Sequence, residues 1–78
     1  MELTDFVKNF ALQFEETAIE EFTPKTQFKN MVEWSSLIAL SIIAMIDEEY
    51  GVAVKGNDIR EAETIEGLFN IVKLLLLR

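Results

Sequence analysis

The longest apolar run in the chain, residues 37–46, most strongly limits what the chain can fold into. Ser35 and Ser36 come directly before it, and Gly51 follows it after an acidic stretch. Serine is a favoured N-cap because its hydroxyl accepts a hydrogen bond from a first-turn amide, and glycine suits the left-handed conformation that ends many helices. The run therefore predicts a helix over about 36–50. Its ten residues, interrupted by Ser41, are too few to cross a bilayer.

The two faces of this helix follow from the helical turn of 3.6 residues. The face predicted to meet the core carries Ala39, Ile42, Ile43, Ile46 and Tyr50, with Leu40 at its edge. The opposite row carries Leu37, Ser41, Ala44 and Glu48, flanked by Ile38 and Met45. This outer row is less polar than a solvated helix needs, so we expect it, the flanking pair included, to contact a partner.

The residues before this helix predict one helix and a long loop. Apolar residues from Leu3 onward recur at helical spacing and predict a first helix over about 2–16. Residues 17–34 show no sustained period and contain the only proline, which favours a loop. A loop of this length in a small domain usually has a functional reason.

The residues after the apolar run predict two more helices. Asn57 or Asp58 can cap a short helix that ends near Ala62, and Thr64 can cap a last helix. No strand is predicted, apart from a short pair or turn at 52–54. In the last helix, the residues expected to face inward are Ile65, Leu68, Phe69, Val72, Leu75 and Leu76, whereas Leu74 and Leu77 are expected to point outward. We therefore expect a single all-α domain spanning residues 1–78, a four-helix bundle with a long first loop and a short third helix.

The chain contains neither cysteine nor histidine. These absences exclude a disulfide framework and a thiol nucleophile, and they remove the usual general base at neutral pH and the commonest metal ligand. Chemistry performed by this chain alone would depend on carboxylates, hydroxyls and lysines. We therefore expect no enzymatic activity and no metal site.

Fourteen acidic residues against seven basic ones give the chain a net charge of −7. Binding to nucleic acid needs the opposite sign, and an anionic membrane surface would repel this charge. The N-terminus lacks the basic start and apolar stretch of a signal peptide. We expect a soluble, cytoplasmic monomer without stable membrane insertion. Its acidic surface either keeps it dissolved or steers it toward basic partners.

The two serines before the long helix can have different roles. Ser35 suits the N-cap, which places Ser36 at the first helical position, where a side chain stays exposed. An anion attached to Ser36 would be stabilised by unpaired backbone amides and by the positive end of the helix dipole. The alternative is that both serines only cap the helix.

Several segments, taken with their spacing, resemble the acyl carrier protein family over almost the whole chain. The segments are "FTPKTQF" at 22–28, Ser36-Leu37, "DEEYG" at 47–51, Asp58-Ile59 and "TIEGLFNIV" at 64–72. The resemblance implies that a Mg²⁺-dependent phosphopantetheinyl transferase attaches 4′-phosphopantetheine from coenzyme A to Ser36. It also implies that acyl chains travel on the thiol of this arm as thioesters, sheltered in the bundle or delivered to enzymes of fatty-acid, polyketide or specialised lipid synthesis.

The chain departs from the family pattern around the same serine. Ser35 replaces the usual aspartate, Ile38 and Ser41 are neutral where acids are typical, and Glu33-Trp34 replaces a small turn. We expect partner contact to be apolar at the start of the helix and charge steering to act at its end, near Glu48. A dedicated pathway fits this pattern better than a general fatty-acid synthase. Trp34 either folds onto the core, which we favour, or contacts a partner.

Two alternatives to an acyl carrier remain open from the sequence. One is an acidic helical interaction module that has lost the arm, for which the missing aspartate is the best support. The other is a peptidyl carrier loaded with an amino acid, although a strongly acidic chain argues for the acyl type.

Overall fold

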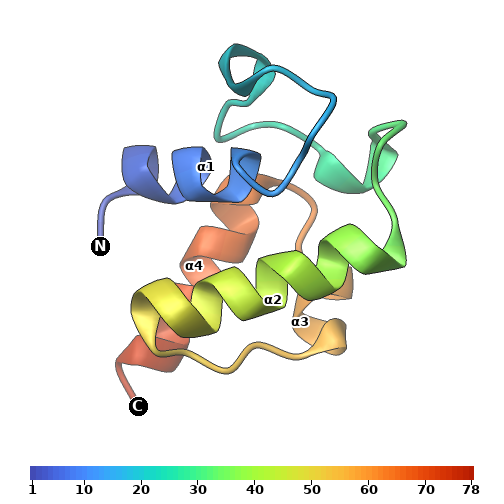
Figure 1. Cartoon of the computed structure of the whole chain (residues 1–78). Coiled ribbons are helices and arrows are strands. Elements are labelled where there is room, and N and C mark those ends of the chain that lie inside the picture. The colour runs from blue at the N-terminus through green and yellow to red at the C-terminus, as the bar shows by residue number, and fades with distance from the viewer.

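The computed structural model, which describes all residues 1–78, is all-helical, with four α-helices and no strand (Figure 1). This result confirms the predicted all-α class. Two single-turn 3₁₀-helices lie in the long first connection. In chain order the elements are α1 (Leu3–Ala11), η1 (Ile19–Glu21), η2 (Phe28–Asn30), α2 (Ser36–Tyr50), α3 (Gly56–Glu61) and α4 (Ile65–Leu76).

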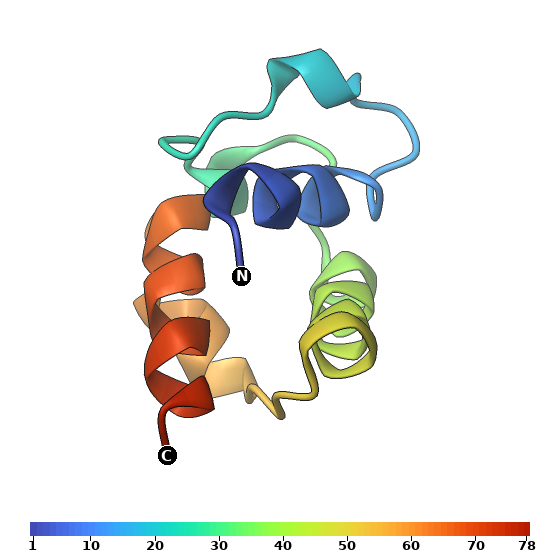
Figure 2. The same ribbon diagram turned by 90° about the vertical axis from the view of Figure 1, so that its left-hand side faces the viewer.

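The helices surround one interior. Figure 2 shows α4 and α2 on opposite sides of the molecule, with α1 lying across the same end of both. Correspondingly, α1 contacts both α4 and α2, and the short α3 contacts α4. The long loop lies over the end of α1 and beyond it, and both termini lie on the side of the molecule away from the start of α2 (Figure 1).

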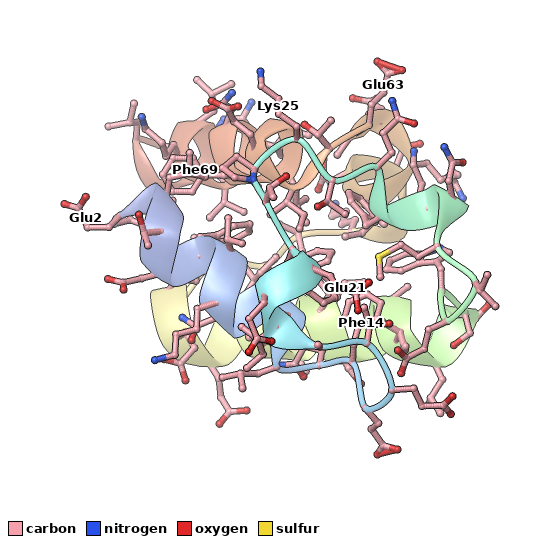
Figure 3. The ribbon with its side chains drawn as sticks, turned by 90° about the horizontal axis from the view of Figure 1, so that it is seen from above. Glu2, Phe14, Glu21, Lys25, Glu63 and Phe69 are labelled. Carbon is pink, nitrogen blue, oxygen red and sulfur yellow. The ribbon has the colours of Figure 1, made fainter.

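The core consists of 17 buried residues, and none of them is polar or charged. A run of aromatic contacts leads from α1 into the loop: the Phe10 and Phe28 rings lie 5.1 Å apart, and those of Phe14 and Phe22 lie 4.9 Å apart. On the other side, Phe69 of α4, which is labelled in Figure 3, packs against Phe6 of α1. The centroids of the two rings lie 5.5 Å apart. Burial of each such side chain stabilises the fold by about 1.5–3 kcal/mol, so the aromatic residues hold the loop to the helices.

The first helix is shorter than predicted, because it ends at Ala11 and not near residue 16. The amide of Phe14 bonds the carbonyl of Ala11 in a tight turn at 3.0 Å. Beyond the turn, the amides of Glu15 and Glu16 donate to the Glu33 carboxylate and not to carbonyls one turn back. A distant side chain therefore replaces the helical hydrogen bonds at this point.

The predicted limits and caps of α2 are confirmed. The Ser35 hydroxyl accepts a hydrogen bond from the Ile38 amide at 3.3 Å, and Gly51 ends the helix with a φ of 66°. The cap predicted for α3 is wrong, because Lys55 is the N-cap residue. Asp58 lies in the first turn, where its carboxylate accepts a hydrogen bond from the Lys55 amide at 2.9 Å.

The last helix begins as predicted, with the Thr64 hydroxyl accepting a hydrogen bond from the Gly67 amide at 3.0 Å. Leu74 and Leu77 are exposed, as expected, but Leu76 is exposed too, contrary to its predicted inward orientation. The inward residues that the structure buries are Ile65, Leu68, Phe69 and Val72, with Leu75 partly buried.

The long loop is also bonded to the start of α4. The amide of Ile65 donates to the carbonyl of Thr26 at 3.2 Å, and the amide of Glu66 donates to the carbonyl of Pro24 at 2.9 Å. First-turn amides of a helix have no partner within the helix, so the loop satisfies donors that would otherwise be left to solvent. The loop is thus an integral part of the fold.

Candidate functional site

Ser36 is the first residue of α2, and its side chain is exposed. No hydrogen bond within the chain engages its hydroxyl, whereas the neighbouring Ser35 hydroxyl is occupied in capping the helix. The two serines therefore differ as the sequence predicted. The Ser36 oxygen is accessible and lies at the helix end where backbone amides lack partners within the helix.

An open groove of about 500 Å³ lies beside Ser36, between the first half of α2 and α3. We call it the α2–α3 groove. Both serines line it, together with the backbone of Gly56. The apolar side chains that line it are Trp34, Ala39, Ile43 and Ile59. In Figure 1 the start of α2 lies at the right of the molecule, above α3.

The charged residues of this groove are both basic. Lys29 and Arg60 line it, and no acidic residue does, although the chain has twice as many acids as bases. The Lys29 ammonium donates a hydrogen bond to the backbone carbonyl of Arg60 at 2.6 Å, and Arg60 donates to the Asn57 side chain at 3.1 Å. Neither cation is paired with a carboxylate, since the one ion pair of the chain joins Lys25 and Glu66.

The other side of the start of α2 has the opposite charge. A hollow of about 290 Å³, which we call the α1-side hollow, lies there. Its acidic residues are Glu15 and Glu33, and it has no basic one. Its remaining lining residues are Gln13, Ser35, Leu37, Ile38 and Ser41.

Glu33 connects the segment before α2 to the segment that follows α1. Its carboxylate accepts hydrogen bonds from the Glu15 amide at 2.8 Å, the Glu16 amide at 3.1 Å and the Thr17 hydroxyl at 2.8 Å. Burial acts to raise the pKa of Glu33, but the hydrogen bonds from the Thr17 hydroxyl and the neighbouring backbone amides outweigh it and hold the pKa below its ordinary value. The carboxylate therefore stays ionised next to the segment that carries Ser36.

The outer face of α2 is only partly the one that the sequence predicts. Leu37, Ala44 and Glu48 are exposed, with Leu37 73% exposed. Leu40, which was expected at the edge of the core face, is 63% exposed. The exposed residues at the start of α2 thus include two leucines.

The predicted outward orientation of Met45 is wrong, because its side chain is only 6% exposed and belongs to the core. Gln13, which follows α1, and Met45 line the same hollow on this side of α2. Ile38 is half-buried against the core, and Ser41 is half-buried. A partner can therefore reach Leu37, Ala44 and Glu48 fully, Ile38 and Ser41 in part, and Met45 hardly at all.

Trp34 folds onto the core as expected, with its ring 5.0 Å from that of Phe28. The basic pair Lys29 and Arg60 was not singled out from the sequence. The two residues are 31 positions apart, and no spacing rule connects them.

No helix in the structure has the length and apolar character needed to cross a membrane. Searches against protein-family models, curated proteins and solved structures each found no match to this chain.

Proposed function

We propose that this chain is an acyl carrier protein with a helical bundle of the carrier type, carrying 4′-phosphopantetheine on Ser36. The observation that supports the proposal most directly is the Ser36 hydroxyl, which is exposed, free of hydrogen bonds and located at the first residue of α2. An anionic group on this oxygen would lie beside unpaired backbone amides. The groove next to it offers apolar and basic side chains, so the residues present fit a phosphate-linked aliphatic arm.

When bound, the group supplies a thiol on which acyl chains are carried as thioesters. The chain itself supplies only the oxygen to which the arm is attached. Ser36 provides the oxygen that forms the new bond to phosphorus, while the phosphorus–oxygen bond to the adenosine 3′,5′-bisphosphate portion of coenzyme A breaks. The Ser36 proton has no histidine acceptor in this chain, so a base of the phosphopantetheinyl transferase takes it.

Partner enzymes would approach along the outer face of α2. Leu37 and Leu40 offer an exposed apolar contact at the start of the helix, and Glu48 lies near its end. Glu48 and its acidic neighbours Asp47 and Glu49 are exposed, which suits steering toward a basic partner surface. Met45 is left out of this surface because it is buried.

A pair of serine variants tests the proposal. Apo protein is incubated with coenzyme A and a transferase of broad specificity, and the intact mass is measured. We expect wild-type protein to gain one phosphopantetheine, Ser36→Ala to gain none, and Ser35→Ala to gain one. Ser35→Ala is the matched control, because it removes the hydroxyl next in sequence and leaves the Ser36 oxygen in place.

The same experiment decides between the carrier and an interaction module without an arm. Wild-type protein that stays unmodified with several transferases would favour the module, which the serine in place of aspartate at position 35 also supports. Equal loading of wild-type and Ser36→Ala protein would assign the arm to a different residue. A peptidyl carrier would load in the same way, and the cargo found on protein isolated from its native cell separates it from an acyl carrier.

A further inference from the structure

We infer that Lys29 and Arg60 hold the phosphodiester on Ser36 and so turn the arm into the α2–α3 groove. This inference rests on the proposed function and adds two positioning residues to it. The two cations come from different parts of the chain, one from η2 and one from α3, and they line the groove onto which Ser36 opens.

The charge of the groove is the first reason. A phosphodiester carries a negative charge at neutral pH, and the groove offers two basic residues and no acidic one. In a chain with a net charge of −7, this is the hollow in which an anion would be attracted and not repelled. Neither cation forms an ion pair with a carboxylate, although Glu63 and Lys29 line a neighbouring hollow together.

The hydrogen bonds of the two cations are the second reason. Lys29 uses one bond to the Arg60 carbonyl, and Arg60 uses one bond to Asn57. An ammonium has three donors and a guanidinium has five, so both retain donors for phosphate oxygens. The existing bonds also hold the two side chains near the groove before any anion arrives.

The opposite side of α2 is the third reason. The α1-side hollow holds the carboxylates of Glu15 and Glu33, and Ser35 lines both hollows. A phosphodiester on Ser36 therefore meets positive charge on the α3 side and negative charge on the α1 side. The apolar floor of the groove, at Ile43 and Ile59, then offers a surface to the aliphatic part of the arm.

The test uses labelled protein loaded with the arm, with loading verified by intact mass. Nuclear Overhauser contacts are measured between the geminal methyl groups of the arm and the methyl groups of Ile43 and Ile59. The variants are Arg60→Gln and the double variant Lys29→Gln/Arg60→Gln. Arg60→Gln retains the backbone carbonyl to which Lys29 donates, so it removes a charge without removing that bond. The matched control is Lys8→Gln/Lys25→Gln, which removes two cations that do not line the groove.

We expect clear contacts in loaded wild-type protein and in the control. Exposed ion pairs contribute little individually, so each cation removed should lower the docked fraction of the arm by about two- to five-fold. Raising the ionic strength should weaken the wild-type contacts in the same direction. The amide spectrum of each variant checks that the fold is retained, and Arg60→Gln gives a result if the double variant does not fold.

Two results would overturn the inference while leaving the carrier function intact. One is loaded wild-type protein without contacts between the arm and the groove. The other is contacts that keep their intensity in Arg60→Gln. A failure of wild-type protein to gain the mass of the arm would overturn the proposed function and this inference together.

Discussion

The two sides of the start of α2 differ sharply in charge, although Ser35 belongs to both. The α2–α3 groove has two basic residues and no acidic one, whereas the α1-side hollow has two acidic residues and no basic one. The net charge of the whole chain, −7, has the same sign as the charge of the α1-side hollow and the opposite sign to that of the groove. A phosphate attached to Ser36 would therefore interact mainly with the charged groups nearest to it, because salt screens charges beyond one Debye length, about 8 Å at physiological ionic strength.

The two sides also differ in how they are held. The groove is built on buried apolar side chains such as Ile59 of α3. On the α1 side, the hydrogen bonds of a single carboxylate, that of Glu33, hold residues 15–17 against the segment before α2. The stability that comes from apolar burial does not depend on pH, whereas the stability that comes from a carboxylate accepting several hydrogen bonds does. The following predictions test this difference.

The largest effect is expected at the floor of the groove. Ile59→Ala removes a side chain that is 4% exposed, and a substitution of this kind costs about 2–5 kcal/mol of unfolding free energy. Chemical denaturation at neutral pH measures it. Leu40→Ala is the matched control on the exposed face, where we expect a change within about 0.5 kcal/mol. Equal losses for the two variants would contradict the assigned burial.

A smaller effect is expected at the residue that both sides share. Ser35→Ala removes the N-cap hydrogen bond of α2 and should cost about 1 kcal/mol of unfolding free energy. Ser35→Asp keeps a capping oxygen, so stability should be close to that of wild type. The aspartate also adds a negative charge beside the groove, and we expect it to reduce the docked fraction of the arm. A gain of arm contacts in Ser35→Asp would contradict the electrostatic account.

The acidic side should respond to pH through Glu33. Its pKa is lowered in the folded state from an ordinary value of 4.5, so its contribution to stability is complete above that value. The contribution is lost as pH falls through the folded-state pKa. Glu33→Gln should therefore be less stable than wild type at neutral pH, and the difference should shrink in acid. We expect Glu33→Gln to lose less unfolding free energy than Ile59→Ala, because solvent screens this carboxylate.

Denaturant midpoints of wild type and Glu33→Gln, measured at neutral pH and well below pH 4.5, follow this change. The matched control is Glu48→Gln, which replaces an exposed carboxylate that makes no hydrogen bond or ion pair within the chain. The difference in midpoint between wild type and Glu33→Gln could instead be the same at both pH values. That result would mean that the charge of the carboxylate does not contribute to stability on this side of α2.

The smallest effect is expected on partner association. Glu48→Gln should lower the efficiency of loading by a transferase by no more than about five-fold, the limit for an exposed ion pair. Wild-type loading should also slow as ionic strength rises. Glu20→Gln, at an exposed position on η1, is the control and should load like wild type. Loading that does not depend on salt would mean that the exposed leucines dominate recognition.

The parts of the fold that the sequence predicted are those governed by local chemistry. Ser35 caps α2 through a residue three positions away, Gly51 ends it with a positive φ, and Thr64 caps α4 in the same manner as Ser35. Each of these interactions involves residues within one turn, so the local sequence contains the information. The exposure of Ser36 follows from the position of the neighbouring cap.

The parts that the sequence did not predict depend on residues far apart along the chain. The apolar spacing continues to Phe14, but α1 ends at Ala11 in a tight turn, and the carboxylate of Glu33 then binds the amides of Glu15 and Glu16. Met45 is buried because it belongs to the core that the helices and the long loop form together. Lys29 and Arg60 meet only after η2 and α3 have come together. Spacing within one helix contains none of this information.

The backbone bonds that join Thr26 and Pro24 to the start of α4 have a consequence for the order of events during synthesis. The loop between α1 and α2 leaves the ribosome before its bonding partners, Ile65 and Glu66 at the start of α4, have been made. The carbonyls of Thr26 and Pro24 therefore bind only solvent until α4 has been made, and a nascent chain stalled before α4 should be cleaved in this loop by a protease that spares the folded protein.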